Sequence, residues 1–187
     1  MVKNFNLSKS QSLSKQCIIK GLTDFYSVFN YIKQLPYGRL ANRSDYTLIL
    51  RENKGTCSTK HAFLKAIAIE NGIEDLKLCL GVFKMNAKNT PKLKLVLEQH
   101  DLDYIPEAHC YLKHNETIMD ITFGNDGDPA FVDTLMHEEF IIPEHIGDYK
   151  VELHQSFLKS WIANENLEFS FDELWKIRES CILAISK

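Results

Sequence analysis

A polar segment that leads directly into an apolar helical run is the feature that most constrains the fold of this chain. The segment is Asn53–His61, which contains Gly55 and Cys57. The run Ala62–Asn71 follows it and is stopped by Gly72, a residue type that often ends helices. This order predicts a helix with Cys57 in its first turn. Unpaired backbone N–H groups and the positive end of the helix dipole favour a thiolate there, and the thiolate is the nucleophilic form of cysteine.

Two strand-like segments further along the chain supply a base for that thiol. Residues 107–113 and 116–122 have strand patterns, and His114–Asn115 between them suits a tight turn because asparagine tolerates left-handed backbone conformations. A turn at these two residues would place His109 opposite Asp120. Opposed side chains in an antiparallel pair project from one face, with Cβ atoms roughly 5 Å apart. The sequence therefore predicts an imidazole beside a carboxylate, whereas a loop one residue longer would separate the pair.

A thiolate at a helix start, an imidazole that accepts its proton and a carboxylate that orients the imidazole make a nucleophilic triad. We predict that Cys57, His109 and Asp120 are these three groups. The backbone N–H of Cys57 is the natural first donor of an oxyanion hole, and Asn53 is a candidate for the second, with an ordinary turn asparagine as the alternative. Taken singly, such a cysteine or histidine is more often structural, so the joint pattern carries the prediction.

His61 lies one turn after Cys57 and leaves two alternatives open. It could act as the base in place of His109, or it could bind a metal ion. A zinc site made of Cys57, His61, His109 and Cys110 matches no common zinc spacing. Cys110 should also point to the face opposite His109. Residues 124–129 resemble a calcium loop but lack its closing glutamate, so we predict a solvated turn there. We expect neither a metal nor a cofactor.

Composition sets the broad class of the protein. At 187 residues, with 44% hydrophobic and 25% charged residues, the chain suits one globular domain with a substantial core. Its net charge of −3 gives no footprint for nucleic acid or an anionic membrane. No apolar run approaches membrane-spanning length, and the first residues lack a signal-peptide core. Five irregularly spaced cysteines indicate reduced thiols, so we expect a cytoplasmic protein that binds neither nucleic acid nor membranes.

Helical and strand patterns elsewhere place further elements around the nucleophile helix. Residues 1–20 are polar and expected to be extended or loosely ordered, and residues 46–50 fit either a strand or the approach to the nucleophile helix. We predict one α+β domain over residues 1–187, with the nucleophile helix packed on an antiparallel sheet, a core at about 40–125 and helical cover at 150–187. The other predicted elements are helices from Thr23 to before Pro36, over 90–99, over 154–164 and over 170–186, and a strand over 140–143.

Five short motifs in the middle of the chain, taken in order, resemble the transglutaminase-like superfamily, which has the papain-like fold. The resemblance covers roughly residues 53–122 and implies that Cys57 is the nucleophile, His109 the general base and acid, and Asp120 the orienting carboxylate. The motifs are Gly55-Thr56-Cys57, Asn71-Gly72-Ile73, Leu78–Phe83, Ala108-His109-Cys110-Tyr111 and Met119-Asp120-Ile121-Thr122.

Three departures from the family pattern concern the surroundings of the triad and leave the triad itself in place. Tyr111 stands where the family often has tryptophan, and Ile121 stands where it often has proline. Residues 90–99 form an insertion before the histidine strand. The family contains protein cross-linkers, peptidases and amidases, so the resemblance leaves the substrate class open.

The residues and the resemblance together predict a thiol enzyme that attacks an amide or peptide carbonyl. Cys57 would form a thioester and pass the acyl group to water or to an amine, so hydrolysis and acyl transfer both remain open. The expected substrate is a peptide or a small amide. The alternative is a non-catalytic binding module that keeps the transglutaminase-like fold, and the intact set of three site residues argues against it.

Overall fold

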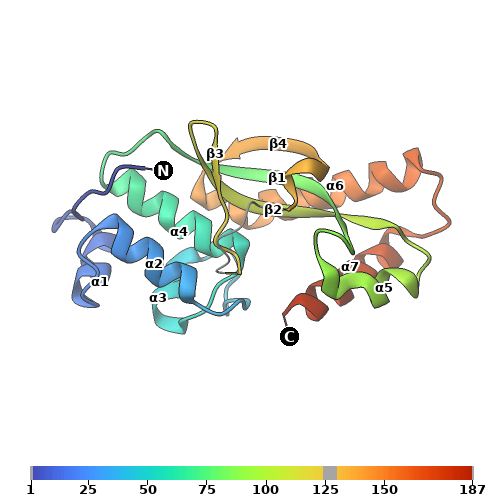
Figure 1. The fold of residues 1–187 in the computed structure, drawn as a ribbon, viewed down its shortest axis with the longest axis horizontal. Coiled ribbons are helices and arrows are strands. Elements are labelled where there is room, and N and C mark those ends of the chain that lie inside the picture. Colours follow the sequence, from blue (N-terminus) through green and yellow to red (C-terminus); the bar gives the residue numbers. More distant parts are fainter. Residues whose placement is uncertain (1, 124–129, 187) are drawn as a thin grey trace. The chain divides into compact units, whose positions relative to one another are not determined.

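A computed structural model of the chain describes residues 2–123 and 130–186 (Figure 1). Within this part of the chain the fold is α+β, as predicted, with seven α-helices and one four-stranded antiparallel sheet in the order β3-β2-β1-β4. The strands are β1 Leu76–Asn86, β2 Tyr104–His114, β3 Thr117–Met119 and β4 Leu135–Ile141. The helices are α1 Ser12–Ile19, α2 Phe25–Gln34, α3 Ile49–Glu52, α4 Cys57–Glu70, α5 Lys94–Glu98, α6 Asp148–Asn164 and α7 Phe171–Ile185.

Two compact units can be distinguished in the chain, and the predicted site residues Cys57, His109 and Asp120 all belong to the first. Organisation as a single domain over the whole chain stays a prediction, and the turn predicted at 124–129 lies outside the described residues. Unit 1 comprises Met1–Leu80, His109–Pro129 and Glu139–Asp148, and unit 2 comprises Gly81–Ala108, Ala130–Glu138 and Tyr149–Lys187.

Helix α4 begins and ends where the sequence predicts. Thr56 is its N-cap and forms a reciprocal capping box with Thr59, so that Cys57 is the first helical residue. Gly72, with φ of +73°, follows the C-terminus in the left-handed conformation that glycine adopts without strain. Every residue from Cys57 to Ala68 is buried, and the helix contacts α1, α2 and two 3₁₀ segments, η1 Tyr46–Leu48 and η4 Pro143–Ile146. This helix is therefore central to unit 1 and has no solvent-facing side over most of its length.

The predicted hairpin exists, but its predicted register is wrong by two residues. Leu112 pairs with Met119 and His114 with Thr117, so the turn lies at Asn115–Glu116 instead of His114–Asn115. Asn115 takes the left-handed conformation, with φ of 50°, which sets the position of the turn. Because side chains alternate with a period of two, a two-residue shift keeps each side chain on its expected face. Strand β3 also ends at Met119, one residue before the predicted site carboxylate.

Two segments have more helix than the sequence predicted. Residues 12–19 form α1, where an extended or loosely ordered chain was expected, because the carboxylate of Glu70 caps the helix start. The Glu70 carboxylate accepts hydrogen bonds from the N–H of Leu13 at 2.9 Å and from the N–H and hydroxyl of Ser14 at 2.8 Å each. Residues 46–50 are helical and not a strand, since the side chain of Asp45 caps the 3₁₀ segment η1, Tyr46–Leu48.

The remaining elements overlap their predicted positions, but α6 begins at Asp148, six residues before the predicted start at 154. Helix α2 begins at Phe25, two residues after the predicted start at Thr23, because Asp24 is its N-cap, and it ends before Pro36. The insertion at 90–99 is helical, and α7 begins after Ser170, which forms a reciprocal capping box with Glu173. Strand β4 begins at Leu135, five residues before the predicted 140–143. It ends at Ile141, short of the predicted end, because Pro143 has no N–H for a strand and instead begins the 3₁₀ segment η4, Pro143–Ile146.

A buried ion pair joins strand β2 to helix α7 within unit 2. Arg178 donates to both carboxylate oxygens of Glu107, from Nε at 2.7 Å and from Nη2 at 2.5 Å. Burial alone would raise the pKa of Glu107, but the charges of Arg178 and His154 hold it at about 2. His154 of α6 also hydrogen-bonds the carbonyl oxygen of Pro106 at 2.9 Å. The ion pair to α7 and the histidine hydrogen bond from α6 therefore fix both C-terminal helices to the same end of β2.

Candidate active site

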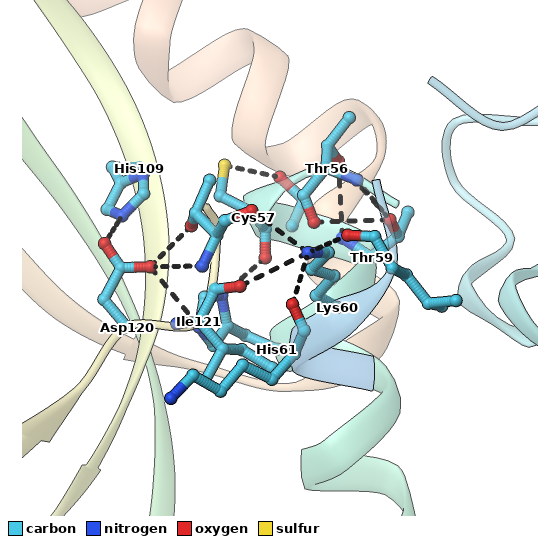
Figure 2. Close-up of polar contacts among 12 residues, drawn as sticks. Thr56, Cys57, Thr59, Lys60, His61, His109, Asp120 and Ile121 are labelled. Atoms are coloured by element: carbon cyan, nitrogen blue, oxygen red, sulfur yellow. Dashed lines mark hydrogen bonds and ion pairs between the residues drawn. The ribbon is translucent and has the colours of Figure 1, made fainter. Parts of the chain in front are cut away.

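The structure brings the three predicted site residues together in unit 1. His109 Nε2 lies 2.9 Å from Asp120 Oδ2 (Figure 2). The side chain of Cys57 also interacts with the imidazole of His109, through its charge and a hydrogen bond. Because Nε2 is taken by the carboxylate, Nδ1 is the ring nitrogen left for the thiol. The side chains of His109 and Asp120 are 12% and 17% exposed, and Cys57 is 8% exposed. The imidazole therefore links the thiol to the carboxylate in a nearly buried site.

The charges of this group favour a protonated imidazole. Burial alone would lower the pKa of His109, but the negative charges of Asp120 and of a Cys57 thiolate, with their hydrogen bonds, raise it well above the ordinary value. Burial alone would raise the pKa of Asp120, yet His109, His61 and Thr122 hold it far below the usual range. The imidazole of His109 is thus favoured in its charged form beside the Asp120 carboxylate.

Asp120 lies beyond the end of β3, so the hairpin ladder does not hold it. Its Oδ1 atom accepts hydrogen bonds from the N–H of Thr122 at 2.9 Å and from the Thr122 hydroxyl at 2.5 Å. Oδ2 then faces His109. Both carboxylate oxygens therefore have donors, which fixes the direction in which the carboxylate points.

His61 has a different role from the two that the sequence left open. Its Nδ1 donates to the carbonyl oxygen of Cys57 at 2.7 Å, and its Nε2 accepts from the N–H of Ile121 at 3.0 Å. This pattern requires the neutral ring, and burial lowers the pKa of His61 to about 4 against the opposing charge of Asp120. Both ring nitrogens are occupied, so His61 serves neither as the base for Cys57 nor as a metal ligand.

Lys60 is the part of the site that the sequence analysis missed. Its side chain is fully buried, and Nζ lies 2.7 Å from the Leu35 carbonyl oxygen, 3.0 Å from that of Thr122, 3.3 Å from that of Ile121 and 3.4 Å from that of Lys33 (Figure 2). No spacing rule distinguishes this lysine from a surface lysine. Only its place in a helix that tertiary contacts bury on all sides gives it this role.

Asn53 ends α3 as a left-handed residue with φ of 50°. Its N–H donates to the carbonyl oxygen of Ile49 at 3.0 Å, and its Oδ1 accepts from the Tyr31 hydroxyl at 2.7 Å. The side chain is exposed. These are the contacts of a turn asparagine, which was the alternative from the sequence, and its part in an oxyanion hole stays a prediction.

Gly55 is required by close packing beside the nucleophile. A Cβ atom there would lie 2.8 Å from Ile49 Cδ1 and 3.0 Å from Lys60 Cγ. The backbone of Gly55 also pairs with the loop after α2, since its N–H donates to the carbonyl of Pro36 at 3.1 Å and its carbonyl accepts from Gly38 at 3.2 Å. The glycine two residues before Cys57 thus lets this loop and α3 approach the start of α4.

Across residues 2–123 and 130–186, no three His, Cys, Asp or Glu side chains are grouped so that they could hold a metal ion. No helix in the same part of the chain combines the length and the apolar character needed to cross a bilayer.

Comparison with known proteins found no protein-family model, no curated protein and no solved structure that matches the chain. What can be said of its function therefore rests on the site geometry and on the motif resemblance.

Proposed function

We propose that this chain is a thiol enzyme of the transglutaminase-like, papain-like class that attacks an amide or peptide carbonyl through Cys57. The observation that supports this most strongly is the position of His109, which bonds Asp120 on one side and Cys57 on the other. A structural histidine has no need of a thiol partner at a helix start. The combination of nucleophile, base and orienting carboxylate is the arrangement that covalent acyl chemistry requires.

The reaction proceeds in two halves. The Cys57 thiolate attacks the carbonyl carbon, and the backbone N–H at the start of α4 stabilises the oxyanion that forms. His109 gives its proton to the departing amine, which leaves a thioester on Cys57. Water or a second amine then attacks the thioester carbonyl, and His109 takes a proton from the attacking group. The C–S bond breaks, and Cys57 leaves as the thiolate. Asp120 keeps the imidazole oriented in both halves and stabilises its charged form.

This chemistry needs no metal or organic cofactor, and its substrate is a peptide or small amide. We infer a cytoplasmic location because all five cysteines are unoxidised and buried, which suits a reducing compartment. Nucleic acid and membranes have no part in the proposed reaction.

The first test is the pH dependence of iodoacetamide alkylation at Cys57, read by mass spectrometry. A thiolate–imidazolium pair should alkylate at a rate that is nearly constant from about pH 6 upward, whereas an ordinary thiol gains rate steadily toward its pKa of about 8.5. His109→Ala should convert the first profile into the second. His114→Ala is the matched control, because His114 lies on the same strand and pairs with Asp75 at 3.0 Å in an equivalent His–carboxylate contact.

The second test uses p-nitrophenyl acetate as an activated acyl donor that makes few demands on substrate recognition. Wild-type protein should release a burst of p-nitrophenolate and carry one acetyl group on Cys57, and Cys57→Ala should do neither. If the wild-type thiol shows an ordinary alkylation profile and accepts no acetyl group, the binding-module alternative is correct and the proposal fails.

A further inference from the structure

The segment that follows Asp120 is held by two consecutive residues of the nucleophile helix. His61 accepts a hydrogen bond from the N–H of Ile121, and Lys60 approaches the carbonyl oxygens of Ile121 and Thr122. Along the chain, the N–H of Thr122 lies between these two carbonyl groups, and it donates to the carboxylate of Asp120. Every backbone polar group of residues 121 and 122 therefore has a partner in α4 or in the carboxylate that the segment positions.

Lys60 extends this contact to a third part of unit 1. Its other two acceptors are the carbonyl oxygens of Lys33, in the last turn of α2, and of Leu35, the residue that caps α2. Carbonyls at a helix C-terminus have no intrahelical partner and carry partial negative charge. An ammonium group offers three N–H donors to these four oxygens, so it satisfies several acceptors that a neutral side chain would leave unpaired.

A buried charge of this kind persists only where its surroundings stabilise it. Burial lowers the pKa of Lys60 to about 8, and the negative charges of Asp120 and Cys57 oppose that shift. The ammonium form is therefore the main form near neutral pH. An apolar residue would fill the same volume without this cost, so the charge calls for a reason beyond packing.

We propose that Lys60 is a positioning residue whose ammonium group, bound to the carbonyls of Ile121 and Thr122, holds Asp120 in its contact with His109. Because the same group binds the end of α2, it ties the orienting carboxylate to the framework around the nucleophile. Lys60 touches none of the reacting atoms and acts through the backbone after Asp120. This inference rests on the proposed function, since it assigns a means of support to the same triad.

The test compares the Cys57 alkylation profile in three variants. Lys60→Met keeps the length of the side chain and removes its donors, and Lys60→Gln keeps two donors without the charge. Both should lower the alkylation rate at about pH 6 by roughly tenfold or more, because a shift of one unit in the imidazole pKa changes the thiolate fraction by about that factor. Lys65→Met is the matched control, since Lys65 is also a buried lysine of α4. It should keep the wild-type profile.

A Lys60 variant that has native circular dichroism and keeps the wild-type alkylation profile at Cys57 would overturn the inference. Lys60→Gln decides the matter where Lys60→Met does not fold. Wild-type protein gives an independent readout, because the Thr122 amide should exchange with solvent as slowly as the amides of β2. Fast exchange at Thr122 would also overturn it. If the wild type lacks the flat alkylation profile while the Thr122 amide is protected from exchange, the proposed function fails. The contacts that hold residues 121 and 122 to α4 are then supported by themselves.

Discussion

The ring of His61 accepts a hydrogen bond from the N–H of Ile121 at 3.0 Å and thereby joins the nucleophile helix directly to the residue after Asp120. The other ring nitrogen returns to the carbonyl of Cys57 at 2.7 Å. One neutral imidazole thus links the backbone of the nucleophile to the backbone of the residue that follows the orienting carboxylate. The second imidazole, of His109, contacts the side chains of Cys57 and Asp120.

Stability should fall as the pH drops, because His61 is neutral in the folded protein. Its folded pKa of about 4 lies below the ordinary 6.5, so the unfolded chain binds more protons between these values. The contribution of His61 is full above pH 6.5 and is lost as the pH falls toward 4, by roughly 3 kcal/mol. Urea unfolding of wild type and His61→Gln over this range measures it. The stability difference between the two proteins should shrink on acidification, and a constant difference would contradict the prediction.

Asp120→Asn should slow acetylation of Cys57 by p-nitrophenyl acetate by about 10²–10⁴-fold. The amide keeps the size of the carboxylate and loses the charge that raises the pKa of His109, so the thiolate–imidazolium pair is no longer favoured. The burst rate measures the effect. Asp75→Asn is the control, because it makes the same change in the exposed His114 pair and should leave the rate as in wild type.

Gly55→Ala should destabilise the protein by about 1–3 kcal/mol, because the new methyl group would overlap Ile49 and Lys60. Gly38→Ala is its control. A Cβ atom at Gly38 would lie 3.1 Å from Lys54 Cδ, which belongs to a flexible side chain that can move aside. Chemical denaturation of both variants gives the comparison, and equal losses would count against the packing argument.

Arg178→Met should cost about 3–5 kcal/mol, because it leaves the buried carboxylate of Glu107 without its cation. Lys94→Met removes one partner of an exposed pair, Lys94–Glu98, and should cost no more than about 1 kcal/mol. Thermal and urea unfolding measure both variants. A small loss for Arg178→Met would mean that water or another donor reaches Glu107.

The buried ion pair between Glu107 and Arg178 also predicts that the protein loses stability in acid. The folded pKa of Glu107, about 2, lies below the ordinary 4.5, so its contribution is full above pH 4.5 and is lost as the pH falls toward 2. The double variant Glu107→Gln with Arg178→Met has no such group and should lose less stability between these values. Unfolding free energies measured at both pH values test this.

The two halves of the site were open to sequence-based prediction to different degrees. The place of Cys57 at the start of α4 follows from its neighbours, since Thr56 and Thr59 cap the helix and Gly72 ends it. The hairpin register was wrong by two residues, yet His109 and Asp120 still meet. They do so because side chains two residues apart on a strand lie on the same face of the sheet, so the shift left both on one face. The hydrogen bond from Thr122 then directs the Asp120 carboxylate toward the imidazole of His109.

By itself the sequence determined the features that depend on a few neighbouring residues. These are the ends of α4, the turn near Asn115 and the order of the three site residues. Caps and left-handed turns are short-range interactions, so the residue types alone select them. Only the tertiary structure decided that Lys60 is buried among carbonyls and that His61 is neutral. Burial and the approach of segments distant in sequence set the charge and the partners of a side chain, and no local pattern contains them.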